Sequence, residues 1–254
     1  MIKKNINFST IILVGGQGSR FSKLNDPPKH LTKLNKNLIL NIIINKLKYS
    51  GFKHFIFPLG HKKEYFIRFF ESKKNQKKFK FKTMKGNISS KDLNSNLSII
   101  SYFDAGKSTK KISRIYKSLK FTKFENLLVV YGDDLANLNF KRIKKIYSFH
   151  DRKKVVVSVF KKNSQYGHLK INKKNEVVKF IEKPPHPLPV NIGFYLINTQ
   201  ILKKFYNKNF ELETHFLPNL AKKNLLISHE HKGYFYSIND KKELLTAKKN
   251  LKNL

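Results

Sequence analysis

The sequence predicts an α/β protein, in which helices cover both faces of a mixed, mostly parallel central sheet. Three observations predict this class. Short apolar runs alternate with segments of helical periodicity along most of the 254 residues. Several of the apolar runs stop abruptly at glycine or aspartate, as strands do where they enter ligand-binding loops. The later part of the chain is rich in hairpin patterns, so antiparallel strands are expected to join the parallel ones.

The first half of the chain gives four strands and three helices. Each predicted strand is a short run rich in β-branched or aromatic residues, and the first helix is ended by Gly51. The predicted strands are residues 9–14, 55–59, 78–82 and 97–102. The predicted helices are residues 37–50, 62–71 and 108–119, with Ser108 or Thr109 as the N-cap of the third. The Asn- and Ser-rich residues 86–96 are predicted to form a loop.

The second half continues the alternation. The predicted strands are residues 126–131, 155–160, 191–197, 225–230 and 234–238. A hairpin is predicted from residues 168–171 and 177–180 across a turn at 172–175. The predicted helices are residues 140–149, 200–205, 213–223 and 241–251. No internal repeat or linker divides the chain, so residues 1–254 are expected to form a single domain.

The composition limits the partners of the protein. The formal net charge is +37, but only five of the 53 basic residues are arginine and the lysines are scattered. We therefore expect a solvated lysine-rich surface and no specific nucleic-acid partner, although the positive field should speed encounter with anionic ligands. No run of residues has the length and apolarity to span a membrane, and a secretory leader is lacking. With no cysteine as well, a cytoplasmic location is expected.

The end of the first predicted strand carries a glycine-rich loop. The apolar residues 11–14 are followed by Gly15, Gly16 and Gly18, and then by Arg20 and Lys29. Glycines let the backbone approach a ligand, so that several N–H groups can converge on a phosphate. A guanidinium and an ammonium suit a polyphosphate, and two prolines restrict the backbone before Lys29. The pattern predicts phosphate binding, whereas the simpler alternative is a turn with two solvated cations.

A second strand end carries paired carboxylates. The apolar residues 127–131 lead into Gly132, Asp133 and Asp134. In open α/β sheets ligands bind outside the carboxyl ends of the strands, so this pair and the glycine-rich loop should share one edge. Asp133 is the candidate ligand for Mg²⁺ against phosphate oxygens. The alternative is that one aspartate caps a helix and the other is solvated.

These motifs resemble those of the sugar-phosphate nucleotidyltransferases, also called nucleotide-sugar pyrophosphorylases. The resemblance rests on Gly-Gly-x-Gly-x-Arg at 15–20, Pro-Lys-x-Leu at 28–31, Gly-Asp at 132–133, Phe-x-Glu-Lys-Pro at 180–184 and Val-Asn-x-Gly-x-Tyr at 190–195. It covers almost the whole chain. It implies a Rossmann-like three-layer αβα sandwich of the nucleotide-diphospho-sugar transferase type. The implied reaction forms an NDP-sugar and pyrophosphate from an NTP and a sugar 1-phosphate, with Mg²⁺ as cofactor.

The resemblance also implies roles for particular residues. Arg20 and Lys29 would be catalytic and Asp133 would bind the metal ion. The implied nucleotide-binding residues are Leu13, Gly15, Gly16, Gly18, Asp104, Gly106 and Thr109. The implied sugar-phosphate-binding residues are Tyr166, Gly167, Glu182, Lys183, Asn191 and Gly193. Glutamate accepts hydrogen bonds from hydroxyls and lysine is a point charge for phosphate, although an exposed pair at a strand end also explains Glu182 and Lys183.

One branch of the family, the glucose-1-phosphate cytidylyltransferases, is similar in further segments. Residues 59–66 and 103–109, followed by Arg114, resemble segments of that branch, which implies CTP and glucose 1-phosphate as substrates. Two departures stand out. Lys111, Ile112 and Ser113 replace the Thr-Gly-Gly of the branch. The second metal aspartate of the family falls within residues 236–239, which contain no acid, with Asp240 just beyond.

Three other functions are alternatives to the predicted nucleotidyltransferase. A catalytically degenerate protein that binds nucleotide sugars is favoured by the missing second aspartate. A glycosyltransferase that uses nucleotide sugars also employs aspartates at strand ends, but it has no need of the Arg20 and Lys29 pair. A basic nucleic-acid-binding module is favoured by net charge alone. A homo-oligomer is compatible with the sequence, which does not specify the oligomeric state.

Overall fold

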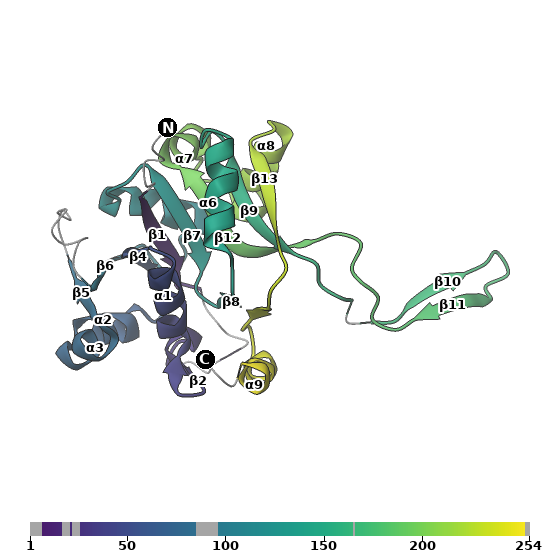
Figure 1. Cartoon of the computed structure of the whole chain (residues 1–254), viewed down its shortest axis with the longest axis horizontal. Coiled ribbons are helices and arrows are strands. Elements are labelled where there is room, and N and C mark those ends of the chain that lie inside the picture. The colour runs from purple at the N-terminus through teal and green to yellow at the C-terminus, as the bar shows by residue number, and fades with distance from the viewer. Residues whose placement is uncertain (1–6, 17–20, 22–25, 85–95, 165, 252–254) are drawn as a thin grey trace.

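An eight-stranded sheet forms the middle layer of the fold (Figure 1). The computed structural model describes residues 7–16, 21, 26–84, 96–164 and 166–251. The strands in chain order are β1 (Phe8–Leu13), β4 (His54–Leu59), β5 (Phe81–Thr83), β6 (Ser98–Asp104), β7 (Asn126–Tyr131), β9 (Val155–Phe160), β12 (Val190–Asn198) and β13 (Leu226–His231). Their order across the sheet is β13-β9-β12-β7-β1-β4-β6-β5.

The sheet is mixed but mostly parallel. Within the described part of the chain, only β12 runs antiparallel to its neighbours in this sheet, β7 and β9. Consecutive side chains point to opposite faces of the sheet, and both faces are apolar. In β7, Leu128 and Val130 belong to the core on one face, and Leu127 and Val129 to the core on the other. The predicted fold class is thereby confirmed.

Helices cover both faces of the sheet. One layer contains α1 (Ile39–Tyr49), α2 (Lys63–Glu71), α6 (Phe140–Phe149) and α9 (Lys241–Asn250). The other contains α5 (Lys111–Lys117), α7 (Thr199–Phe205), the π-helix Leu212–Phe216 and α8 (Leu217–Lys222). The 3₁₀ helices are η1 (Lys29–Leu31) and η2 (Ser118–Phe121). Where the chain is described, its helices lack the combination of length and apolar character that a bilayer crossing demands.

Two expectations about local structure were wrong in part. A strand was predicted at residues 78–82, but α3 (Lys73–Phe79) covers the start of that stretch and the strand, β5, begins only at Phe81. Ser72 caps this helix by accepting a hydrogen bond from the Asn75 N–H (3.3 Å), and Lys80 ends it in the left-handed region at φ 53°. The single helix expected over residues 213–223 is divided into the π-helix and α8, with Pro218 at the start of α8.

Four short strands and one projecting hairpin complete the fold. The short strands pair as β2 (Lys33–Leu34) with β3 (Asn37–Leu38) and β8 (Asp134–Ala136) with β14 (Phe235–Ser237). The predicted hairpin is formed by β10 (His168–Ile171) and β11 (Val177–Ile181), which pair antiparallel. We call residues 162–186 the ribbon. It extends away from the body of the molecule (Figure 1).

Candidate functional site

A cavity of about 710 Å³ lies at the edge of the sheet where β1, β4, β6 and β7 end and β12 begins. This volume is in the range of small-molecule sites. Its lining includes Leu13, Gly15, Gly16, Pro28, Lys29, His30, Lys62, Thr109, Lys111, Arg114, Tyr131, Asp133, Asp134, Asn191, Glu211, Ser237 and Asn239. Segments far apart in the sequence therefore meet at one site, at the edge that topology predicts for a ligand.

The loop after β1 contributes the first wall. Leu13, Gly15 and Gly16 line the cavity, whereas Gly18 and Arg20 lie outside the described residues. Gly15 is buried, and a Cβ added there would come within 1.7 Å of Arg114 Nη1. Gly16 is exposed, and a Cβ there would have no atom of the described residues within 4 Å. The two glycines thus differ: Gly15 makes room for Arg114, whereas Gly16 has no such contact with the described part of the chain.

Lys29 lies in η1 and its ammonium contacts the Asp133 carboxylate. Both side chains are largely shielded from solvent, with exposed fractions of 12% and 22%. The neighbouring His30 is buried beside Phe66, and desolvation lowers its pKa to about 4. His30 is thus neutral near pH 7. The cation that meets the carboxylates in this corner of the cavity is Lys29.

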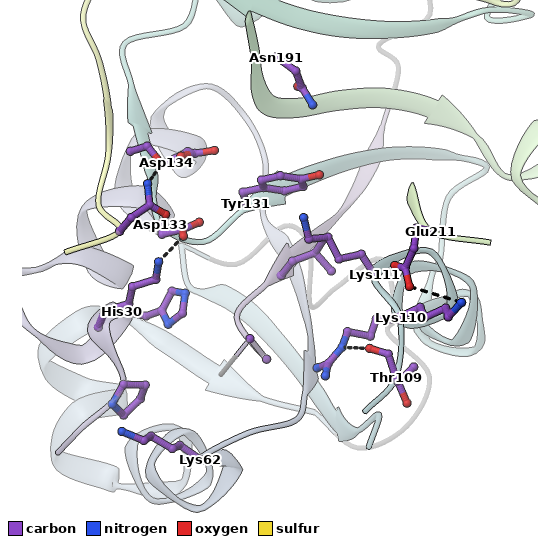
Figure 2. Close-up of a pocket in the computed structure, with 18 of the residues that line it drawn as sticks. His30, Lys62, Thr109, Lys110, Lys111, Tyr131, Asp133, Asp134, Asn191 and Glu211 are labelled. Atoms are coloured by element: carbon purple, nitrogen blue, oxygen red, sulfur yellow. Dashed lines mark hydrogen bonds and ion pairs between the residues drawn. The ribbon is translucent and has the colours of Figure 1, made fainter. Parts of the chain in front are cut away.

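Asp133 and Asp134 follow β7, on the opposite side of the cavity from Thr109 and Lys110 (Figure 2). Asp134 is buried, and burial together with the charge of Asp133 raises its pKa to about 8. Gly193 lies against it at φ +75°, where a Cβ would come within 2.4 Å of Asp134 Oδ2. Gly193 is therefore placed behind the carboxylate pair, where its missing side chain makes room for Asp134.

Arg114 joins the loops that follow three parallel strands. Its Nε and Nη atoms donate to backbone carbonyls of Thr109 (2.8 Å), Pro58 (3.3 Å), Gly106 (2.9 Å) and Lys107 (3.1 Å). It also fills the space beside Gly15 and Gly60. The loops after β1, β4 and β6 consequently pack around one guanidinium, whose planar fork of donors suits several carbonyls at once.

The three nucleotide-binding residues predicted after β6 occupy different positions. Thr109 lines the cavity, while Gly106 adopts φ +96° in the turn before it. The side chain of Asp104 is half exposed and pairs with Lys63 (2.6 Å), and it accepts a hydrogen bond from the Gly106 N–H (2.9 Å). The ion pair with Lys63, then this hydrogen bond, lowers the pKa of Asp104. Asp104 therefore shapes the loop from outside the cavity.

A hydrogen-bond chain supports Asn191, a predicted sugar-binding residue that lines the cavity. The Asn191 amide donates to Tyr195, and the Tyr195 hydroxyl donates to Tyr131 (3.1 Å). Tyr131 in turn donates to Glu213 (2.5 Å), which also pairs with Lys111. Burial by itself would raise the pKa of Glu213. The contacts with Lys111 and Tyr131 have the larger effect, so the pKa of Glu213 is lowered. Tyr131 and Lys111 were not among the predicted site residues.

The late strand β14 brings Ser237 to the carboxylate pair. Ser237 lies opposite Asp134 in the β8–β14 pairing and hydrogen-bonds to its carboxylate. Asn239 also lines the cavity, while Asp240 caps α9 by accepting from the Glu243 N–H (2.8 Å). Within the residues described, no three His, Cys, Asp or Glu side chains gather as a metal site. The oxygen donors at this corner are two carboxylates, one hydroxyl and one amide.

Four predicted sugar-phosphate residues lie on the ribbon. Tyr166, Glu182 and Lys183 are exposed and Gly167 is half-buried, and none of the four lines the cavity. The side chains of Glu182 and Lys183 approach each other at 3.5 Å. The structure thus brings Lys29, Asp133, Thr109 and Asn191 around one cavity and leaves the four predicted residues of the ribbon outside its lining.

The sequence matches a known family model and curated relatives. The family model described as nucleotidyl transferase matches residues 9–245. A protein of Bacillus subtilis named "Probable glucose-1-phosphate cytidylyltransferase" is 32% identical over 249 residues, which cover 94% of each chain. The glucose-1-phosphate cytidylyltransferase of Salmonella typhimurium is 26% identical, and the match covers 89% of this chain and 88% of that one.

Solved structures share the fold. A UDP-glucose pyrophosphorylase complexed with UDP-glucose superposes with a TM-score of 0.69 at 16% identity, covering 96% of this chain and 98% of the other. HddC from Yersinia pseudotuberculosis gives a TM-score of 0.66 at 19% identity, covering 96% and 99%. At these identities the structural likeness concerns the fold.

Proposed function

This chain belongs to the nucleotidyl transferase family, and on that basis we propose that it joins an NTP to a sugar 1-phosphate. The products are an NDP-sugar and pyrophosphate. The observation that carries the proposal is the cavity in which Lys29 meets Asp133 beside the backbone of Gly15 and Gly16. A cation, a carboxylate pair and an open glycine loop together suit a triphosphate with its metal ion.

The proposed reaction is an in-line displacement. A phosphate oxygen of the sugar 1-phosphate forms a bond to the α-phosphorus of the NTP. The bond between that phosphorus and the oxygen bridging to the β-phosphate breaks, and pyrophosphate leaves with the electron pair. The attacking oxygen is already anionic, so no general base and no covalent enzyme intermediate are needed. Catalysis then consists of positioning the two substrates and stabilising the charge that develops between them.

In the proposal, residues that line the cavity position the two substrates and stabilise the developing charge. The loop at Gly15 and Gly16 presents its backbone to the phosphates, and Lys29 stabilises the charge that develops on them. Arg20 is proposed to assist Lys29 from the same loop, in the part of the chain that is not described. Thr109 lies on the nucleotide side of the cavity, and Asn191 offers an amide to the sugar.

The residues around Asp133 fit a divalent cation such as Mg²⁺. Two adjacent carboxylates, one of them buried with a raised pKa, are short of positive charge, and the hydroxyl of Ser237 adds an oxygen donor. We propose that Asp133 and Asp134 hold the ion, with Ser237 or Asn239 nearby. When bound, Mg²⁺ would neutralise phosphate oxygens and orient the triphosphate.

The substrates and location are proposed from the relatives. Two curated relatives that match most of this chain are named as cytidylyltransferases of glucose 1-phosphate, so CTP and glucose 1-phosphate are the first pair to test. We place the reaction in the cytoplasm, where cells make nucleoside triphosphates. The test is a matrix of four NTPs against several sugar 1-phosphates with Mg²⁺, read as pyrophosphate release. Release that requires both substrates is expected, and no release from any pair would overturn the proposal.

One observation favours a second candidate, a protein that binds nucleotide sugars without turnover. Ser237, which faces Asp134 from β14, offers a hydroxyl where a third carboxylate, beside Asp133 and Asp134, would hold the metal ion more tightly. The same substrate matrix separates the two functions when it is combined with calorimetry. Binding of an NDP-sugar with no pyrophosphate release in either direction of the reaction would favour the binding protein. A glycosyltransferase has no specific observation in its favour.

A further inference from the structure

Lys111 is the first residue of α5 and lines the cavity beside Tyr131 (Figure 2). Its ammonium lies 4.6 Å from the centre of the Tyr131 ring and contacts the Glu213 carboxylate. Three elements therefore meet at this ammonium: α5, the end of β7 and the π-helix. Position 111 is also where the chain departs from the branch that it resembles, because a lysine replaces the first residue of Thr-Gly-Gly.

The ion pair between Lys111 and Glu213 is half-exposed. The two side chains have exposed fractions of 47% and 37%. Ion pairs that meet solvent contribute little free energy, because water already stabilises both charges. Contact of an ammonium with the face of an aromatic ring near solvent adds a comparably small amount. Lys111 can therefore exchange the Glu213 carboxylate for another anion at little cost.

Glu213 keeps a partner when Lys111 leaves it. The Tyr131 hydroxyl donates to the Glu213 carboxylate (2.5 Å) and accepts a hydrogen bond from the Tyr195 hydroxyl (3.1 Å). This hydrogen bond does not depend on the ammonium, and solvent reaches the rest of the carboxylate. Lys111 is joined to its helix by a flexible four-carbon stem. In an exchange of partners, Glu213 therefore stays in place and the ammonium of Lys111 moves.

The neighbouring Lys110 is held more firmly than Lys111. Its ammonium pairs with Glu211 (3.4 Å) and also donates a hydrogen bond to the carbonyl of Asn209 (2.8 Å). Two acceptors from the segment before the π-helix thus bind Lys110, whereas Lys111 has the Glu213 carboxylate and the face of a ring. Of these two consecutive lysines, Lys111 is the one that is free to follow a ligand.

The proposed reaction brings two negatively charged substrates together in the cavity. Lys29, beside Asp133, supplies one cation. Lys183, which was predicted for the sugar phosphate, lies outside the lining. Lys111 lies over the ring of Tyr131, two positions before Asp133, so it adds a second cation at the same strand end. Two cations there offset the repulsion between the phosphates better than one.

We propose that Lys111 is a phosphate-binding residue whose ammonium passes from Glu213 to a phosphate group of the substrates, and that Glu213 competes with that phosphate. The inference rests on the proposed function, which brings phosphates into this cavity. Both the NTP and the sugar 1-phosphate carry such a group. An ammonium is a compact charge with three donors, so it suits phosphate oxygens from either source.

Calorimetric titration with inorganic pyrophosphate and, separately, with glucose 1-phosphate tests the site without turnover. Both titrations contain Mg²⁺ and little salt, so that charge interactions are least screened. Lys111→Met keeps the stem over the ring and removes the charge, and it should weaken binding of at least one probe about tenfold. Lys111→Arg keeps the charge and should stay within about threefold of the wild type. The probe that responds identifies the source of the phosphate.

A control variant corrects for the general effect of charge. The protein carries a net charge of +37, so the loss of any lysine weakens the field that attracts an anion. Lys120→Met removes one charge from η2, outside the cavity lining, and should bind both probes as the wild type does. A loss of affinity in Lys120→Met as large as that in Lys111→Met would overturn the proposal.

Glu213→Gln separates phosphate binding from a purely structural ion pair. The amide keeps an oxygen that accepts from Tyr131, but it no longer attracts Lys111 by charge. Because Glu213 competes with the phosphate, this variant should bind the responding probe about two- to fivefold more tightly. Equal affinity of the variant and the wild type would overturn the competition. A pair that merely braces α5 against the π-helix would make Glu213→Gln and Lys111→Met weaken binding alike, which would overturn the proposal.

The outcomes also separate this inference from the proposed function. Unchanged affinity of Lys111→Met for both probes, or a wild type that binds neither, would overturn the role of Lys111 whatever the turnover. Weaker binding in Lys111→Met, together with no pyrophosphate release from any substrate pair, would overturn the function and leave the phosphate site standing. In the active enzyme, Lys111→Met should raise about tenfold the KM of the substrate that supplies the phosphate and leave the other KM within about twofold.

Discussion

The Lys29 ammonium contacts the Asp133 carboxylate across 104 positions of sequence. Lys29 is the first residue of η1, and Asp133 lies in the turn that follows β7. In the proposed reaction, a phosphate would take the place of the carboxylate beside Lys29, and the metal ion would take the place of the ammonium beside Asp133. The first prediction therefore concerns the role of Lys29 in catalysis.

We expect Lys29→Ala to lower kcat about 10²–10³-fold, because an ammonium that acts on developing charge contributes more in the transition state than in the ground state. Initial rates of pyrophosphate release at saturating substrates measure this effect. Lys33→Ala, an exposed lysine in β2, is the matched control and should retain activity. Near-normal turnover in the Lys29→Ala protein would contradict the assigned role.

Two neighbouring glycines should differ in their tolerance of alanine. A Cβ at Gly15 would meet the Arg114 guanidinium at 1.7 Å, whereas a Cβ at Gly16 would meet no described residue within 4 Å. Gly15→Ala should therefore push Arg114 from its carbonyl partners and cost about 1–3 kcal/mol of unfolding free energy. Gly16→Ala should stay within about 0.5 kcal/mol of the wild type. Urea unfolding of both variants checks the difference, and equal losses would show that Arg114 moves aside freely.

A carboxylate at position 237 should strengthen metal binding. Ser237 faces Asp134, so Ser237→Asp would place a third acid at the corner formed by Asp133 and Asp134. Without a divalent ion the added repulsion should lower Tm, and Mg²⁺ should restore it, with roughly tenfold tighter apparent binding than in the wild type. Thermal unfolding across a magnesium titration measures both effects. Ser237→Asn is the neutral control, and the same magnesium response in both variants would refute the assignment.

A buried histidine should make the protein less stable at acid pH. His54 lies between the hydroxyls of Ser9 (3.1 Å) and Ser101 (3.3 Å), and burial lowers its pKa to about 4 from 6.5. Between these two pH values the unfolded chain takes up a proton that the folded chain does not. Stability is therefore lost as pH falls through this window, by about 2 kcal/mol at pH 4.5 for this residue.

The variant His54→Gln isolates this contribution. Its stability at pH 7.5 is expected to be lower than that of the wild type, because the packing and hydrogen bonds change. Its further loss between pH 7.5 and 4.5 should be smaller, because the titrating group is gone. Urea unfolding at both pH values gives the comparison, and equal pH-dependent losses in the two proteins would exclude His54 as the cause.

Much of the fold and part of the site followed from local sequence signals. The strand at residues 126–131 and the helix at 140–149 were predicted with the bounds that the structure has, because each is a strong periodic segment between clear stop residues. The shared edge of the glycine-rich loop and Asp133 was predicted from topology, since the carboxyl ends of parallel strands lie at the same edge of a sheet. The strand predicted at residues 78–82 begins only at Phe81, because the helix that Ser72 caps extends to Phe79, where the alternation of Phe and Lys is typical of a strand.

The features that the sequence did not predict depend on contacts between segments that are far apart in the chain. Thr109 was one candidate N-cap for the helix at 108–119, but α5 begins at Lys111 and the Thr109 hydroxyl donates to Ala105 O (2.5 Å). The support of Asn191 by Tyr195, Tyr131 and Glu213 joins residues up to 82 positions apart, which no local pattern reveals. The separation of the ribbon from the cavity likewise has no signal in periodicity.

The Arg114 guanidinium, which donates to carbonyls of β4 and of the loop after β6 and packs against Gly15 and Gly60, has a consequence for how specificity diverges in such proteins. A change of backbone in any one of the loops after β1, β4 and β6 alters the space or the carbonyls around this side chain and so affects the other two. Substitutions around the nucleotide should therefore accumulate in compensating sets, and a single loop transplanted from a homologue should carry its preference across only when its neighbours come with it.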